Sequence, residues 1–216
     1  MNKKKLIVLI ICILLVVIAA VGACVMYLTQ EEPEEFKASF VYNSDRKAPS
    51  YTFYTPDYNS DIFSDPDYDG VVVPYISYTN NAITYTIIEE DYSDFGPVVE
   101  LFGNYFDSLK AGDAASFSAL HSERFFKHNY YWESIAPQRL YNINIEYMFE
   151  KDMTDELYGE VTKYVYRTSY KIMKNDGTFR SDIGSDASRD MYLEIVYKNG
   201  ELFIDAWGDC VKYPEE

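Results

Sequence analysis

The clearest hydrophobic pattern in the chain is an uncharged apolar run of 23 residues, from Leu6 to Leu28. As a helix it would be about 34 Å long, enough to cross the roughly 30 Å hydrocarbon core of a membrane. Residues 3–5 before it are lysines, and four glutamates follow it within residues 31–35. Because lysine stays on the cytoplasmic side, we expect residues 1–5 inside the cell, 6–28 as a transmembrane signal anchor and the rest outside.

Two other interpretations of this run stay open. Val21-Gly22-Ala23 has the small residues of a signal-peptide cleavage site, which would give a secreted protein. The same residues followed by Cys24 resemble a bacterial lipoprotein box, in which Cys24 would carry the lipid. The apolar run continues to Leu28, where a processed protein usually turns polar, and this favours the uncleaved anchor.

Residues 29–70 show no period of 3.6 or 2. They contain four prolines, one glycine, and ten acidic against three basic residues. This composition predicts an extended or disordered acidic stalk. Its Phe and Tyr side chains could still lie against the folded domain, which we expect over residues 71–216.

Regular patterns begin at Val71. Alternating side chains on both sides of Asn80-Asn81 predict a hairpin over 71–90. Apolar residues at helical spacing then predict two helices joined by Ala111-Gly112-Asp113, with Ser93 or Asp94 as the first cap and Pro97 in the first turn. A shorter helical piece is expected over 123–127, and a turn interrupted by Pro137 over 133–140. In the rest of the chain, apolar and polar side chains alternate over four stretches, which predicts four strands: Tyr141–Phe149, Tyr164–Ile172, Met191–Tyr197 and Leu202–Ala206. The last two are joined by a predicted hairpin turn at Asn199-Gly200.

The predicted elements come in the order of two helices joined by a Gly-Asp turn, a short helical piece and four long strands. This order resembles the nuclear transport factor 2-like superfamily, which includes the ketosteroid-isomerase-like enzymes. The resemblance covers about Pro97 to Trp207, and its most family-like local piece is Phe106–Asp113. It implies an α+β domain shaped like a cone, with helices packed on a curved, mostly antiparallel sheet and a pocket at the mouth. The family often has a strand pair between its second and third helices, whereas here the hairpin precedes the first helix.

Charge and cysteine content limit the partners that the exported domain can bind and the kind of organism that produces it. The chain has a net charge of −16, and beyond residue 28 there are 16 basic against 35 acidic residues, a net charge of −19. So acidic a domain repels phosphate backbones, and we expect no nucleic-acid partner. Cys12 and Cys24 lie in the apolar run, so Cys210 is alone outside it and no intrachain disulfide is expected in the exported part. Without disulfides or glycosylation sequons, an exported domain of this kind indicates a Gram-positive bacterium.

The resemblance directs attention to a few groups that could carry chemistry. Enzymes of that family use Asp and Tyr, or His and Asp, in the pocket, and a carboxyl kept neutral in an apolar site can donate a hydrogen bond to an oxyanion. Asp205, with Phe203 and Trp207 on its predicted face, is the best candidate carboxyl. His121 and His128 are the two histidines, too few for a zinc site, and His121 near a helix end suits a dipole contact.

Two further clusters are better explained as structure. Asp65–Gly70 matches the first half of a calcium-loop pattern, but Ile76 stands where the loop requires glutamate, so we expect an acidic turn. A mixed-charge group around a Gly-Ser loop is expected to hold that loop by surface ion pairs; it consists of Arg180, Arg189, Asp182, Asp186 and Asp190.

The sequence therefore predicts no catalytic, cofactor or metal residue. The favoured function is a non-catalytic binding or scaffolding role at the cell envelope, toward a protein or envelope component. The alternative is a pocket enzyme of the isomerase or dehydratase kind that uses Asp205 or His121.

Overall fold

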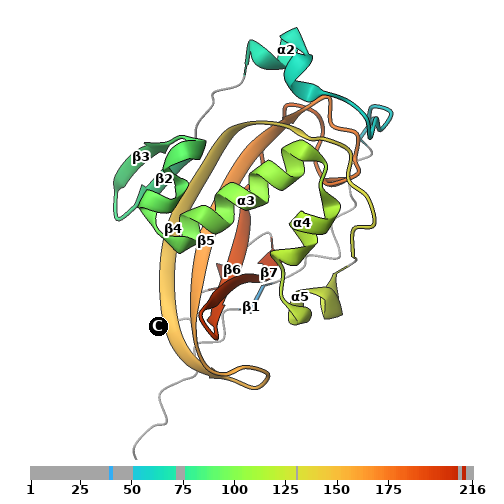
Figure 1. The fold of residues 1–216 in the computed structure, drawn as a ribbon. Coiled ribbons are helices and arrows are strands. Elements are labelled where there is room, and N and C mark those ends of the chain that lie inside the picture. Colours follow the sequence, from blue (N-terminus) through green and yellow to red (C-terminus); the bar gives the residue numbers. More distant parts are fainter. Residues whose placement is uncertain (1–38, 41–50, 72–75, 130, 209–210, 213–216) are drawn as a thin grey trace, which may run out of the picture. The chain divides into compact units, whose positions relative to one another are not determined.

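A six-stranded, mostly antiparallel sheet with helices on one face makes the chain an α+β protein (Figure 1). The computed structural model describes residues 39–40, 51–71, 76–129, 131–208 and 211–212. The order in the sheet is β3-β2-β4-β5-β6-β7, and only β2 and β4 run parallel. The strands are β2 Ile76–Asn80, β3 Ile83–Ile87, β4 Arg139–Asp155, β5 Gly159–Met173, β6 Met191–Lys198 and β7 Glu201–Gly208. A separate two-stranded sheet pairs β1 Ser39–Phe40 with β8 Val211–Lys212.

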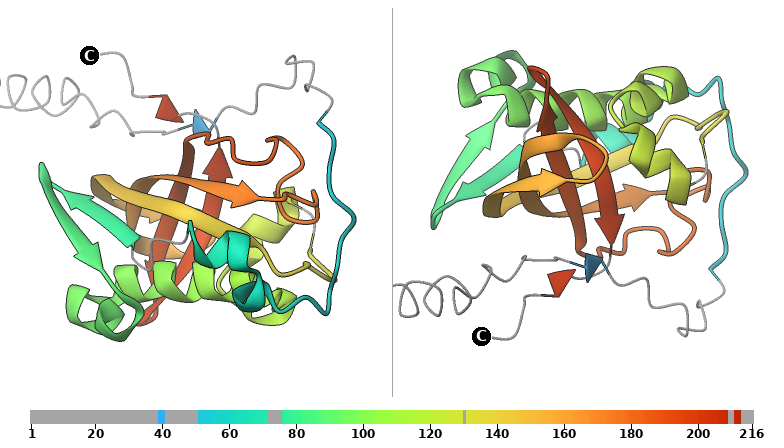
Figure 2. Two further views of the ribbon diagram at one scale, coloured as in Figure 1. Left: turned by 90° about the horizontal axis from the view of Figure 1, so that it is seen from above. Right: turned by 90° about the horizontal axis from the view of Figure 1, so that it is seen from below.

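The long hairpin of β4 and β5 gives the sheet its curvature, as Figures 1 and 2 show. The two predicted strands lie inside these elements, but β4 and β5 extend through the charged stretch 150–163 to a turn before Gly159. Two register shifts interrupt β4, one between Tyr141 and Asn144 and one between Tyr147 and Phe149. Because each bulge adds twist and bends its strand, the shifts explain the arch of this hairpin.

The predicted N-terminal hairpin forms and extends the sheet beside β4. Its turn is shifted by one residue from the prediction, because Asn81 (φ 47°) and Ala82 (φ 67°) occupy the two central positions. Positive φ at both positions is the geometry that two-residue hairpin turns require. Residues 72–75 lie outside the described part of the chain.

Three helices follow in the predicted order: α3 Pro97–Ala111, α4 Ala114–Ala119 and α5 Glu123–His128. Gly112 in the left-handed conformation ends α3, and Asp113 caps α4 by accepting from the backbone N–H groups of Ala115 and Ser116. The predicted caps Ser93 and Asp94 are wrong, because they belong to the 3-10 turn η2 (Glu89–Phe95) and Gly96 is the N-cap of α3. The turn expected over 133–140 does not form, because residues 133–138 run irregularly and residues 139–140 already belong to β4.

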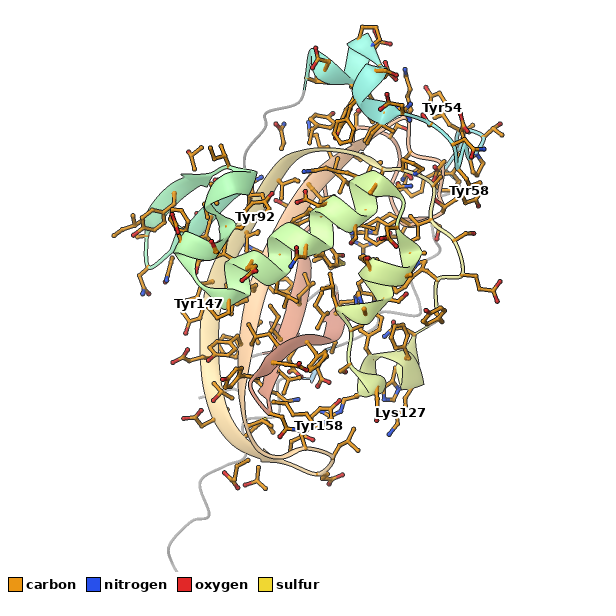
Figure 3. All side chains as sticks on the ribbon, viewed as in Figure 1. Tyr54, Tyr58, Tyr92, Lys127, Tyr147 and Tyr158 are labelled. Carbon is orange, nitrogen blue, oxygen red and sulfur yellow. The ribbon has the colours of Figure 1, made fainter. Side chains whose placement is uncertain are left out.

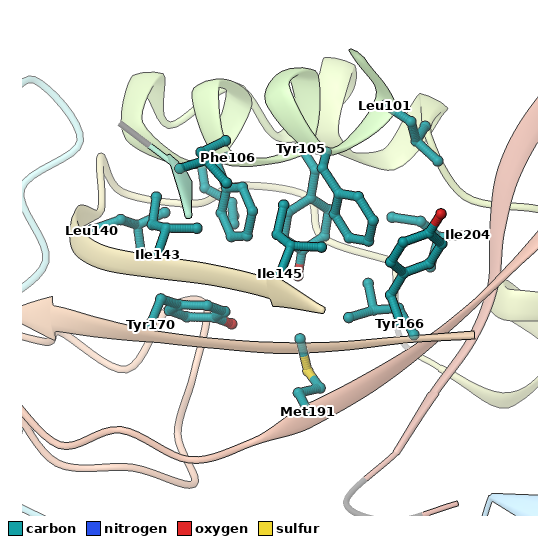
Figure 4. Close-up of a cluster of buried hydrophobic side chains, with 14 of the residues drawn as sticks. Leu101, Tyr105, Phe106, Leu140, Ile143, Ile145, Tyr166, Tyr170, Met191 and Ile204 are labelled. Atoms are coloured by element: carbon teal, nitrogen blue, oxygen red, sulfur yellow. The ribbon is translucent and has the colours of Figure 1, made fainter. Parts of the chain in front are cut away.

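The hydrophobic core lies between α3 and the sheet, as Figure 4 shows. Aromatic rings pack there among aliphatic side chains: Phe102 lies edge-on against Tyr166 at 5.2 Å between centroids, and Phe106 against Tyr170 at 5.7 Å. Phe117 from α4 continues the ring cluster and is fully buried. Of the 22 tyrosines in the sequence, six are buried among the described residues: Tyr68, Tyr78, Tyr92, Tyr105, Tyr166 and Tyr170. Tyrosine therefore contributes both to the core and to the surface.

Residues 51–70, part of the predicted stalk, fold onto the domain through the short helices η1 (Ile62–Ser64) and α2 (Pro66–Asp69). Ile62 and Tyr68 are both buried, and Asp65 accepts from Arg139 and Lys174. Residues 51–70 are therefore packed and hydrogen-bonded against the folded domain and do not form a free stalk.

The predicted anchor, residues 6–28, lies outside the described residues, as do Cys12, Cys24 and Cys210. Among the described helices, none is both long and apolar enough to span a membrane.

Candidate functional site

A bulge in β7 decides where Asp205 lies. Glu194 pairs with Ala206 and Ile195 with Ile204, so Asp205 has no residue opposite it on β6. The extra residue breaks the alternation that placed Asp205 and Trp207 on one face. Trp207 instead joins the aromatic core, while Asp205, 1% exposed, reaches a cluster of charged side chains.

The charged cluster joins β4, β5, β6, β7 and α5. Asp205 Oδ2 lies 3.2 Å from both Lys163 Nζ and Arg124 Nη1. Lys163 also lies 2.6 Å from Glu194 Oε1 and 3.3 Å from Asp155 Oδ2, and Arg124 makes a second bond to Asp155. Three carboxylates thus share two cations, which is the pairing that buried charges require.

Two hydroxyl groups complete the coordination of Asp205. Ser122 Oγ donates to Asp205 Oδ1 at 2.6 Å, and Tyr158 OH donates to the same oxygen at 3.1 Å. Ser122 also caps α5 by accepting from the backbone N–H of Phe125. Figure 3 shows Tyr158 at the lower end of the long hairpin. Asp205 is therefore held by two cations and two hydroxyl groups, which is the arrangement of a structural counter-ion.

The other two carboxyls of the cluster differ from each other. Burial opposes ionisation of Asp155, but the hydrogen bond from Arg124, backbone N–H groups and the charge of Lys163 together hold its pKa below the usual range. Burial raises the pKa of Glu194, and the attraction of Lys163 only partly offsets it. Asp155 is thus paired with both Arg124 and Lys163, whereas Glu194 is paired with Lys163.

His121 follows α4 and is 6% exposed. Its Nδ1 lies 2.8 Å from the carbonyl oxygen of Phe117, to which it must donate, so Nε2 carries the lone pair. Nε2 is buried and has no hydrogen-bond partner in the described part of the chain. Burial lowers the pKa of His121 to about 4, so the ring is neutral, and its contact with the end of α4 is the hydrogen bond from Nδ1 to the carbonyl oxygen of Phe117.

The cavity beside His121 does not reach Asp205. A cavity of about 190 Å³ is lined by His121, Ser122 and Tyr158, and its lining does not include Asp205. The two hydroxyl groups that bind Asp205 form part of the wall between them. The two predicted candidates are therefore neighbours, but Asp205 is sealed behind Ser122 and Tyr158.

A second, larger pocket of about 320 Å³ lies against the predicted mixed-charge loop. Arg180 and Arg189 both bind Asp182, and Arg180 is 6% exposed. The other two acids lie elsewhere: Asp186 accepts from Tyr141, and Asp190 is 3.9 Å from Arg167. The expectation of surface ion pairs is wrong for Arg180, because its loop folds over the end of the core and buries the guanidinium.

The other predicted positions carry no assembled site. Asp65 is the N-cap of α2 and lies 3.0 Å from Arg139 Nε and 2.9 Å from Lys174 Nζ, so cations of the protein occupy it. Within the described ranges, no three His, Cys, Asp or Glu side chains are grouped to hold a metal ion. His128 is exposed at the end of α5.

Sequence reasoning missed Lys163 and Glu194, and a usable signal existed. Lys163 is flanked by Val161 and Val165 on one face of a strand, and Glu194 stands in the apolar run of the next strand. A lone lysine and a lone glutamate on apolar faces of adjacent strands predict a buried pair.

Comparison with family models, curated proteins and solved structures finds no match to this chain.

Proposed function

We propose that this chain is a membrane-anchored extracellular domain of a Gram-positive bacterium, with a non-catalytic binding or scaffolding role at the cell envelope. The lysines at 3–5 and the uncharged run 6–28 support the anchor and its orientation. Lipid attachment at Cys24 is the second choice. The helices across a curved antiparallel sheet support the cone-like, nuclear transport factor 2-like form of the domain.

One observation carries the non-catalytic role: the space between the helices and the sheet is filled by rings. Tyr105, Phe106 and Phe117 are fully buried there, and Tyr170 closes the space from β5. A pocket enzyme of the resembled kind needs an open cavity at this place, with a base near its substrate. Asp205, the best candidate base, is instead held by two cations and two hydroxyl groups.

Site-specific photo-crosslinking in intact cells tests the binding role. Exposed tyrosines on different elements can each be replaced by benzoylphenylalanine, which preserves an aromatic side chain: Tyr54, Tyr85, Tyr131 and Tyr197. A binding domain should give the same crosslinked product from one or two of these positions and none from the others. Equal labelling from all four, or from none, contradicts a specific partner.

Protease accessibility tests the orientation separately. Protease added to intact cells should remove a C-terminal tag and leave an N-terminal tag intact; protection of the C-terminal tag contradicts the proposal. Intact mass then distinguishes the two anchors, because lipidation at Cys24 removes residues 1–23.

A second candidate function has one observation in its favour. The unpaired, buried Nε2 of His121 is an acceptor, and His121 lines a cavity together with Tyr158. These groups would suit proton transfer in an isomerase or dehydratase. Exchange of the α-protons of ketone substrates with D₂O, followed by NMR, tests it: exchange that His121→Gln abolishes without unfolding the protein would replace the binding proposal.

A further inference from the structure

The larger pocket, of about 320 Å³, is built from the ends of three strands. Phe179–Asp182 in the loop after β5, Met191 at the start of β6, and Trp207 and Gly208 at the end of β7 form most of its lining. No residue of α3, α4 or α5 lines it. It is therefore distinct from the ring-filled space under the helices and from the cavity beside His121.

Its polar wall is a fixed pair of guanidinium groups. Arg180 donates from Nε to Asp182 Oδ1 at 2.5 Å and from Nη2 to Asp182 Oδ2 at 2.7 Å, while its Nη1 donates to Tyr170 OH at 3.1 Å. Arg189 Nη1 lies 3.2 Å from the same Asp182 oxygen, Oδ2. Bidentate pairing with Asp182 fixes the plane of Arg180 and occupies its fork, so Arg180 adds positive charge to the wall, and Arg189 is the more exposed of the two guanidinium groups.

Its other wall is apolar. Phe179 and Met191 are buried, and Trp207 packs near Phe179 with 6.5 Å between ring centroids. The pocket thus combines aromatic and thioether surface with charged groups on one side, which is the usual composition of a site for a small organic ligand.

The charge of the lining indicates the sign of that ligand. In a chain with 19 basic and 35 acidic residues, this pocket is lined by two arginines and one aspartate. A cationic lining in a strongly acidic protein attracts a small anion locally, and guanidinium groups match carboxylate geometry.

We propose that this pocket binds a carboxylate attached to an apolar body. The carboxylate lies against Arg189 and Arg180, and the body lies against Phe179, Met191 and Trp207. The carboxylate belongs either to a free small molecule or to the C-terminus of a peptide. This inference rests on the proposed binding role and names the chemistry that the domain recognises.

Trp207 supplies the readout, because it lines the pocket and the chain has only one other tryptophan, Trp132. Full-length protein carrying Trp132→Phe is titrated in mild detergent with hexanoate and with hexanamide, its neutral analogue. Hexanoate should change the Trp207 emission in a saturable way, and hexanamide should bind at least about tenfold more weakly, since a charge-assisted hydrogen bond is lost. A leucine-ended tripeptide with a free or amidated C-terminus then separates the two sources.

Two variants test the polar wall, with a matched control. Arg189→Gln should weaken hexanoate binding about tenfold, and Ser181→Glu, which adds an anion to an exposed lining position, should weaken it by a similar factor. Ser93→Glu adds the same charge to an exposed position of η2, outside the lining and near the opposite edge of the sheet, and should leave the affinity within about twofold.

The pocket assignment is overturned by equal binding of acid and amide, by equal effects of Ser181→Glu and Ser93→Glu, or by no saturation up to roughly 10 mM hexanoate. Failure here leaves the cell-surface crosslinks unaffected. Loss of the crosslinks with an intact hexanoate response contradicts only the wider binding role.

Discussion

Tyr68 donates a hydrogen bond from its hydroxyl group to the main-chain carbonyl oxygen of Leu140 at 2.6 Å, across 72 positions of the sequence. Tyr68 is 1% exposed and lies on α2, within the region that the sequence predicts as stalk. The bond attaches residues 51–70 to the start of β4, so the folded unit begins well before Val71.

The first prediction concerns this attachment. Tyr68→Phe should lower the free energy of unfolding by about 1 kcal/mol, because it removes one buried hydrogen bond and leaves the ring in place. Tyr58→Phe, the same change at a 52% exposed position, should stay within about 0.5 kcal/mol. Urea unfolding measures both.

Truncation extends the same test. Removal of residues 1–50 should leave a soluble protein with one cooperative transition, whereas removal of 1–70 should lower its stability markedly, because Ile62 and Tyr68 leave the core. Equal stability of the two truncations would show that residues 51–70 contribute nothing to the fold.

Much of the fold could be predicted from local patterns. The two helices around Gly112, the Asn199-Gly200 turn and the alternation in β4 and β5 all depend on short-range spacing and turn chemistry. The full length of β4 and β5 could not, because residues 150–163 are charged on both faces and only pairing between the strands makes them regular.

The candidate site was harder to predict for the same kind of reason. A single bulge at Asp205 separates it from Trp207, and alternation alone cannot locate a bulge. The charged cluster around Asp205 draws on β4, β5, β6 and α5, and the pairs that hold it together are between 31 and 83 positions apart in the sequence. Such contacts exist only after the sheet has formed.

The second prediction concerns that cluster. Asp205→Asn should lower the free energy of unfolding by about 3 kcal/mol, because Lys163 and Arg124 lose a buried counter-charge. Asp190→Asn is the control, since Asp190 is 53% exposed and lies 3.9 Å from Arg167; its effect should stay within about 0.5 kcal/mol.

A double-mutant cycle separates charge from packing in the second prediction. Adding Lys163→Met to Asp205→Asn removes the cation together with its partner, so the double variant should be more stable than the sum of the two single effects by about 1 kcal/mol or more. Strict additivity would mean that the two side chains are not coupled.

The third prediction concerns the turn of the β2–β3 hairpin. Ala82 has a φ of 67°, a left-handed conformation that costs a residue with a Cβ atom roughly 1 kcal/mol. Ala82→Gly should therefore raise the free energy of unfolding by about 0.5 kcal/mol. Ala115→Gly, inside α4, should lower the free energy of unfolding by about 0.5–1 kcal/mol. The same Ala→Gly change should therefore stabilise the protein at one exposed position and destabilise it at the other. A loss of stability at Ala82 would contradict the turn geometry.

The last prediction concerns pH and His121. The pKa of His121 is about 4 in the folded protein because the ring is buried, whereas an unfolded histidine has a pKa of about 6.5. Between these values the unfolded chain binds a proton that the folded protein does not, so stability should fall as pH decreases from about 6.5 to 4, by up to roughly 1.4 kcal/mol per pH unit. Among the described rings around His121, only Tyr105 is ionisable, and burial raises its pKa, so it stays neutral throughout.

His121→Gln isolates this contribution, because a glutamine does not titrate. The difference in unfolding free energy between the wild type and this variant should change with pH only in that window, whatever constant amount the substitution costs in packing. Burial raises the pKa of Glu194, which acts in the opposite direction, but it is common to both proteins and cancels in the difference. A difference that is flat from pH 7 to 4 would mean that the imidazole of His121 is accessible to protons, and the cavity beside Tyr158 would then have to be open to the ring.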